Sequence, residues 1–155
     1  MRSSLPEPDD LTSLLIRADY SNEAAWQAAF DVVAAPVLLP GLPASFRARF
    51  TVVQDVSFGR LTMTGLHEVL QDSPVPEVFV ADHLTVMGEE HTLLVVRVAP
   101  SDRGATESFR VAPSFAWAVQ NNLSLANMDF LDFLADVDSD GVYRGGASSL
   151  PSSTP

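Results

Sequence analysis

An acidic run near the C-terminal end of the sequence has the residue types of a calcium loop. Asp136, Asp138 and Asp140 alternate with other residues and precede Gly141, which matches the first half of an EF-hand loop. Position twelve of such a loop falls on Ala147, where a bidentate Glu is needed. The pattern therefore favours a solvent-exposed, Asp-rich helix end, and the three aspartates are the candidate ligands of the alternative, a metal site.

Two further aspartates follow apolar runs that are typical of buried strands. Asp19 comes after residues 13–17, and Asp82 comes after residues 77–81. Ligands bind outside the carboxyl ends of strands in open α/β sheets. If these two strands are neighbours, the two carboxylates can share a divalent ion, or the charge of one carboxylate raises the pKa of the other. A turn or capping role is the alternative, and it is favoured for Asp19, which lies two residues before a predicted N-cap at Ser21.

Amide side chains are concentrated between two predicted helices. Asn121, Asn122 and Asn127 alternate with apolar residues there, and amides can satisfy the backbone groups that helix ends leave unpaired. We expect a hydrogen-bonded turn in which Asn127 caps the second helix. A polar recognition corner is the alternative, with the same asparagines as binding residues.

Signatures of catalysis are missing elsewhere. The chain has no Cys and no Lys, and its motifs include neither a nucleophile elbow nor a glycine-rich phosphate loop. Its histidines, His67, His83 and His91, have no paired ligand spacing. A Ser-His-Asp triad assembled from distant positions stays open. We predict no catalytic residue and no cofactor, and the sequence favours a protein that is not an enzyme.

Hydrophobic periodicity predicts the elements that position these residues. The predicted order is β-α-β-α-β-β-β-α-α-β, and the fold class is α/β: a mixed sheet of five or six strands with helices on both faces. The sheet begins parallel and includes an antiparallel hairpin. Strands are expected at residues 13–17, 49–54, 77–81, 92–98, 108–112 and 142–144; helices are expected from Ser21 to before Pro36, at 64–70, at 113–120 with a break near 121–122, and after Asn127.

Length and charge narrow the class of protein. The 155 residues are 46% hydrophobic, and their net charge is −11. We expect a flexible lead-in over residues 1–10, a single globular domain over 11–144 and a disordered Ser/Pro/Gly tail over 145–155. The negative charge argues against nucleic acid as a partner. Without a membrane-spanning or secretory segment, the predicted location is the cytoplasm.

Several sequence blocks resemble an uncharacterised domain family found mainly in actinobacteria. The blocks are LLIRADYSNEAAW (14–26), TVVQD (51–55), FVAD (79–82) and, most specifically, NNLSLANMDFLDFLADVDSDGVYRG (121–145). The likeness covers residues 11–145. It implies a small stand-alone bacterial domain, typically cytoplasmic, and it carries no activity, cofactor or catalytic residue that can be transferred.

Taken together, these observations favour a non-catalytic acidic module that binds a basic protein or acts as a regulator, such as an immunity or inhibitor protein. Residues 127–144 alone hold five Asp and one Arg, and complementary charge speeds association and helps to select partners. The alternative is a small enzyme or ligand-binding domain with a divalent ion at Asp19 and Asp82. A cavity lined by Asp19, Asp82 and the region of Asn121 would favour the alternative.

Overall fold

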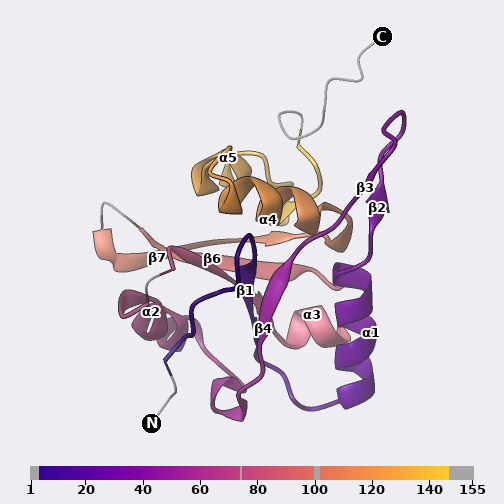
Figure 1. The fold of residues 1–155 in the computed structure, drawn as a ribbon. Coiled ribbons are helices and arrows are strands. Elements are labelled where there is room, and N and C mark those ends of the chain that lie inside the picture. The colour runs from indigo at the N-terminus through magenta and orange to yellow at the C-terminus, as the bar shows by residue number, and fades with distance from the viewer. Residues whose placement is uncertain (1–3, 74, 100–101, 147–155) are drawn as a thin grey trace.

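The main sheet of the protein is mixed and central. The computed structural model describes residues 4–73, 75–99 and 102–146. It contains a six-stranded sheet with the order β4-β1-β5-β6-β7-β8 (Figure 1), which confirms the predicted α/β class. The strands are β1 (Ser13–Arg17), β4 (Phe50–Val53), β5 (Glu77–Ala81), β6 (Leu93–Ala99), β7 (Asp102–Val111) and β8 (Val142–Tyr143).

One strand of this sheet, β6, runs opposite to the other five. β1 pairs in parallel with both β4 and β5, because helical connections return the chain to the same edge. β6 is antiparallel to β5 and to β7, with which it forms the predicted hairpin, and β8 pairs in parallel with β7. The parallel pairing of β1 with β5 brings the residues that follow both strands to one edge of the sheet.

Helices cover both faces of the sheet. Alternate residues of β1 point to opposite faces, so Leu15 belongs to one core while Leu14 and Ile16 belong to the other. The larger core receives side chains from four helices and the smaller core from a helix and a 3₁₀ turn. The helices of the larger core are α1 (Glu23–Val33), α3 (His83–Met87), α4 (Ala116–Ser124) and α5 (Phe130–Leu134). The smaller core is covered by α2 (Met63–Gln71) and η1 (Val56–Phe58).

Helix boundaries differ from the predicted ones at three places. Asn22, not Ser21, caps α1, because its side chain accepts the backbone N–H of Ala25 at 2.9 Å. The predicted break near residues 121–122 is wrong, since α4 runs through both asparagines after a 3₁₀ turn, η2 (Pro113–Phe115). Asp129 caps α5 in place of the predicted Asn127, because a reciprocal capping box with Asp132 satisfies the helix start.

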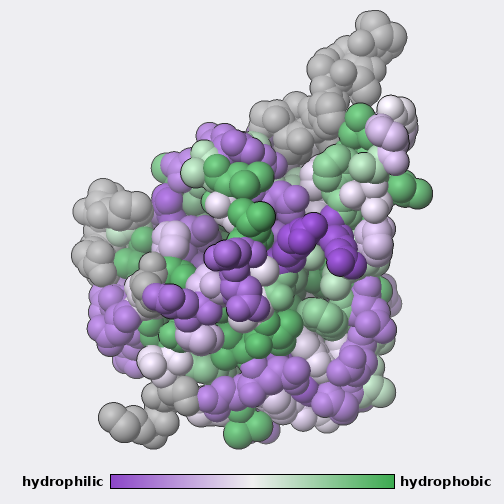
Figure 2. Space-filling view, viewed as in Figure 1, coloured by the Kyte–Doolittle hydropathy of each residue, from purple (hydrophilic) through white to green (hydrophobic). Residues whose placement is uncertain are grey.

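A short hairpin projects from the body of the domain. Strands β2 (Val37–Leu38) and β3 (Ser45–Phe46) pair between the predicted helix that ends before Pro36 and the predicted strand at 49–54. Figure 1 shows this hairpin extending beyond α1, and Figure 2 shows apolar residues gathered over it. Its base is fixed by Phe46, whose ring stacks on Trp117 with 4.8 Å between centroids. None of the described helices combines the length and apolar character that a bilayer span requires.

Candidate functional site

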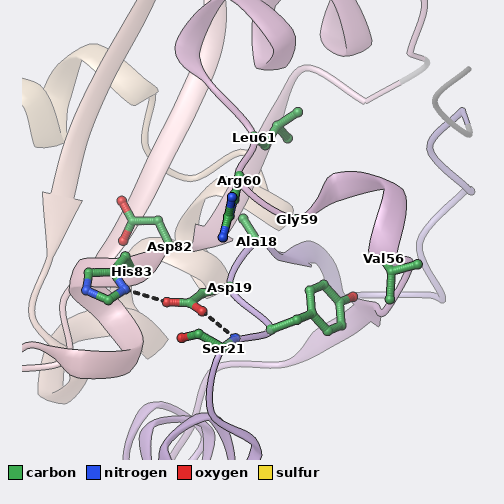
Figure 3. Close-up of a pocket in the computed structure, with 10 residues that line it drawn as sticks. Ala18, Asp19, Ser21, Val56, Gly59, Arg60, Leu61, Asp82 and His83 are labelled. Carbon is green, nitrogen blue, oxygen red and sulfur yellow. Dashed lines mark hydrogen bonds and ion pairs between the residues drawn. The ribbon is translucent and has the colours of Figure 1, made fainter.

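The carboxyl edge of β1 and β5 opens into a pocket of about 780 Å³. Figure 3 shows its lining side chains. The position agrees with the rule that ligands of α/β sheets bind outside the carboxyl ends of strands. The lining comes from three connections: Ala18, Asp19, Tyr20 and Ser21 after β1; Val56, Gly59, Arg60 and Leu61 before α2; Asp82 and His83 after β5.

A buried carboxylate holds an exposed imidazole at the centre of this pocket. Oδ2 of Asp19 lies 2.7 Å from Nδ1 of His83 (Figure 3). The Asp19 side chain is 8% exposed and that of His83 is 77% exposed. An ionised carboxylate accepts hydrogen bonds only, so Nδ1 donates and Nε2 of His83 is left to interact with a ligand. The contact joins residues that are 64 positions apart in sequence.

Hydrogen bonds keep Asp19 ionised. Its Oδ1 accepts the backbone N–H of Ser21 at 2.8 Å. Burial raises the pKa of this carboxyl, but hydrogen bonds from Ser21 and His83, together with the charge of His83, outweigh burial and lower the pKa below its usual value. Both oxygens of Asp19 are therefore engaged inside the protein, as the predicted turn role requires.

Asp82 lines the same pocket but is engaged elsewhere. Its side chain caps α3 by accepting the backbone N–H of Thr85 at 3.1 Å. Arg110 on β7 binds both oxygens of the same carboxylate, and Figure 3 shows that this carboxylate does not point at Asp19. Burial raises the pKa of Asp82, but the hydrogen bonds and charge of Arg110 and the bonds from Thr85 lower it overall. The sheet thus brings the two predicted aspartates to one pocket with separate partners.

Arg60 supplies a cation to the pocket. Its backbone is in the left-handed region, with φ of 59°, which L-residues other than Gly, Asn and Asp rarely adopt. The Arg60 N–H donates to Ala18 O at 2.9 Å, so this conformation is tied to the end of β1. Arg17, Arg97, Arg110 and Arg144 form ion pairs with carboxylates, whereas the described contacts of Arg60 include none.

The arrangement suits recognition of an anionic group. The guanidinium of Arg60 can donate hydrogen bonds, and Nε2 of His83 can donate one when the imidazole is protonated; charge-assisted hydrogen bonds are the stronger ones. Val56, Leu61 and the ring of Tyr20 add apolar surface beside them. The carboxylates of Asp19 and Asp82 already accept hydrogen bonds from groups of the protein.

The acidic run after α5 is organised around an arginine. Arg144 donates to Asp138 at 2.8 Å and to Asp140 at 2.8 Å, and it also contacts both carboxylate oxygens of Glu90 at 2.7 Å. Across the described parts of the chain, no group of three or more His, Asp or Glu side chains is arranged to hold a metal ion. Asp136 is the third predicted ligand, and Ala147, the twelfth position of the loop, lies outside the described residues.

The predicted asparagine corner lies away from this pocket. Asn121 donates to Arg47 O at 3.2 Å and to Gln120 Oε1 at 3.0 Å. Asn122 donates to Ala118 O within α4 at 2.7 Å. Asn127 is exposed in the turn before α5, and its backbone N–H donates to Asn122 O at 3.0 Å. These hydrogen bonds stay within α4 and the turn that follows it or reach the segment before β4, so they satisfy backbone groups near the end of α4 and do not link α4 to α5.

Sequence reasoning missed the groups that face a ligand here. His83 follows Asp82 at the end of a predicted strand, and this position is the signal that could have identified it. No comparable signal marks Arg60, because its place in the pocket depends on the connection between η1 and α2.

The fold and pocket define a mixed α/β domain with a ligand-sized cavity at the carboxyl edge of its parallel strands. The chain belongs to a family described as a domain of unknown function (DUF6924), which it matches over residues 12–146. The resemblance to an uncharacterised family is thereby confirmed, while its actinobacterial distribution stays a prediction. No curated protein matches the chain.

Proposed function

We propose that the protein is a non-catalytic binding module that takes a small carboxylic acid with an apolar body into the β1–β5 pocket. The Asp19–His83 contact of 2.7 Å carries this proposal, because it fixes an exposed imidazole above a carboxylate that is already satisfied. A bacterial, cytoplasmic setting is part of the proposal and rests on the resemblance of the sequence blocks alone.

The hydrogen-bond partners of the two pocket carboxylates indicate which charge the ligand carries. Asp19 is engaged by Ser21 and His83, and Asp82 is engaged by Arg110. A divalent ion would have to displace these hydrogen bonds, and leaving the Arg110 side chain, which is 17% exposed, without its partner costs about 1–3 kcal/mol. Arg60 and His83 remain to contact a ligand, and the guanidinium and the protonated imidazole both suit an oxygen acceptor that carries negative charge.

The apolar side chains that line the pocket indicate the chemical nature of the uncharged part of the ligand. Val56 is 77% exposed at the pocket rim, and burying such a side chain favours binding by about 1.5–3 kcal/mol. Leu61 and the Tyr20 ring continue this surface. A molecule with a carboxylate at one end and a hydrocarbon or aromatic body at the other satisfies both parts of the pocket.

The test compares benzoate with benzamide by backbone amide NMR. Benzoate is expected to shift the amide signals of residues 18–21 and 83 saturably, and the neutral amide is expected not to. Arg60→Gln should weaken benzoate binding about tenfold, the loss of one charge-assisted hydrogen bond. Arg49→Gln, an equal charge change outside the pocket, should leave it unchanged. Equal responses to the two probes, or a shift that Arg60→Gln does not reduce, would overturn the proposal.

Docking of a basic protein, such as a toxin or nuclease, is a second candidate function. It is favoured by the net charge of −11 and by α5, where Leu131 and Asp132 are both exposed. The affinity for a captured basic partner should fall with salt and should drop on Asp132→Asn but not on Asp31→Asn in α1. Binding no tighter than that of an unrelated protein of equal charge would contradict it.

A further inference from the structure

A second pocket of about 330 Å³ lies at the base of the projecting hairpin, and it shares no residue with the β1–β5 pocket. Its lining comes from the end of α1, from β3 and the segment before β4, and from α4. Figure 2 shows strongly hydrophilic residues over the segment that joins the hairpin to β4. The lining residues are Pro36, Ser45, Phe46, Arg47, Arg49 and Asn121.

Two arginines meet in this pocket without an acidic neighbour in its lining. Arg47 and Arg49 are two positions apart in an extended segment, so their side chains leave the backbone on the same side. Both are exposed, and the described contacts include no ion pair for either. This is unusual in a chain with twenty Asp and Glu against nine Arg, in which Arg17, Arg97, Arg110 and Arg144 are all paired with carboxylates.

The backbone under these arginines is held in place by a buried amide. Gln120 is fully buried, and its Oε1 accepts the backbone N–H of Arg49 at 2.8 Å. Asn121 donates to Arg47 O at 3.2 Å, and the Ser13 N–H donates to Arg49 O at 3.1 Å. The segment is therefore fixed before any ligand arrives, which lowers the entropic cost of binding.

We propose that the Arg47–Arg49 pocket binds the phosphate group of a small phosphomonoester. A phosphate monoester carries a charge between about −1.5 and −2 at pH 7 and offers three strong acceptor oxygens. Two guanidinium groups match that charge, and each can bind two oxygens in a fork. The acidic remainder of the surface repels an extended polyanion, so the ligand is a small molecule and not a nucleic acid.

This site is independent of the proposed carboxylic-acid pocket, and the two tests use each other's variants as controls. The probes are inorganic phosphate and phenyl phosphate at pH 7.5, with ionic strength held constant by sodium chloride. Backbone amide NMR should show saturable shifts at residues 45–49 and 121 with both probes. Phenyl phosphate should bind at least as tightly as phosphate if the site takes esters.

Arg47→Gln and Arg49→Gln should each weaken phosphate binding about tenfold or more, while Arg60→Gln should leave it unchanged. Thermal unfolding of each variant checks that the fold is retained, and the localised shifts in the wild-type protein test the site without any variant. Shifts that do not saturate, shifts reproduced by chloride alone, or equal weakening by Arg60→Gln would overturn the proposal. Binding of phosphate without phenyl phosphate would overturn the ester assignment.

Discussion

Arg110 binds both carboxylate oxygens of Asp82: its Nη1 lies 2.9 Å from Oδ2, and its Nη2 lies 2.8 Å from Oδ1. The same carboxylate caps α3, while Arg110 also donates to the Thr92 hydroxyl and carbonyl oxygens. A single ion pair therefore joins the end of β5, the start of α3 and the open end of the β6–β7 hairpin.

Replacing Asp82 is expected to destabilise the whole domain. Asp82→Asn removes the charge that compensates a largely buried guanidinium, and we expect the free energy of unfolding to fall by about 2–3 kcal/mol. Chemical denaturation measures the change. Asp72→Asn at the exposed end of α2 is the control and should stay within about 0.5 kcal/mol of wild type. Equal stability of the two variants would contradict the role assigned to the ion pair.

Glu77 makes the stability of the domain depend on pH, and its pKa is shifted in the opposite direction from that of Asp82. Burial raises the pKa of Glu77 to about 7; Arg97 across the strand opposes this shift and Asp129 adds to it. Between the unfolded value near 4.5 and about 7, the folded state holds more protons than the unfolded state. Stability is therefore lost as pH rises through this window.

The variant Glu77→Gln isolates this effect. The free energy of unfolding of the variant minus that of the wild type should increase by about 2–3 kcal/mol from pH 4.5 to pH 7.5, because the amide does not ionise. Denaturation at the two pH values gives the difference. Glu68→Gln on the exposed face of α2 is the matched control, and a wild-type-like pH profile for Glu77→Gln would show the assignment to be wrong.

Gln120 is expected to be needed for stability as well as for the Arg47–Arg49 pocket. Gln120→Leu keeps the volume but leaves the Arg49 N–H and the Leu11 carbonyl without their partner. Buried unsatisfied groups of this kind cost about 1–3 kcal/mol each. Gln27→Leu on the exposed face of α1 is the control. An unchanged denaturation midpoint for Gln120→Leu would count against the bracing role.

Two glycines with the same backbone conformation should differ in their tolerance of a side chain. Gly145 and Gly41 both have φ of 79°. A Cβ at Gly145 would lie 2.3 Å from Cε1 of Phe115, whereas none of the described atoms lies within 4 Å of a Cβ at Gly41. Thermal unfolding should show that Gly41→Ala costs about 1–2 kcal/mol and that Gly145→Ala costs more. The reverse order would be inconsistent with the packing of Phe115.

Elements with strong local signals were predictable from the sequence. The apolar runs of β1 and β5 gave the boundaries found in the structure, and helical periodicity located α1 and α2. The β2–β3 hairpin was missed because its strands are two residues long and lie among prolines. α3 was missed because its five residues depend on the Asp82 capping box, which pattern analysis cannot detect.

The candidate site was predictable only in part. Parallel pairing of β1 with β5 accounts for the meeting of Asp19 and Asp82 at one edge, and the sequence raised that pairing as a condition. The partners that determine their chemistry, His83 and Arg110, could not be assigned. Each depends on contacts between segments tens of residues apart, and no local propensity encodes such contacts.

The position of β1 between β4 and β5 has a consequence for synthesis on the ribosome. Translation delivers Leu14, Leu15 and Ile16 before either of the strands that flank them, so the nascent chain carries an unpaired apolar segment until β4 has emerged. The β6–β7 hairpin, by contrast, pairs neighbouring segments and can close as soon as both are made. We therefore expect chaperones to bind the nascent chain mainly at its N-terminal third.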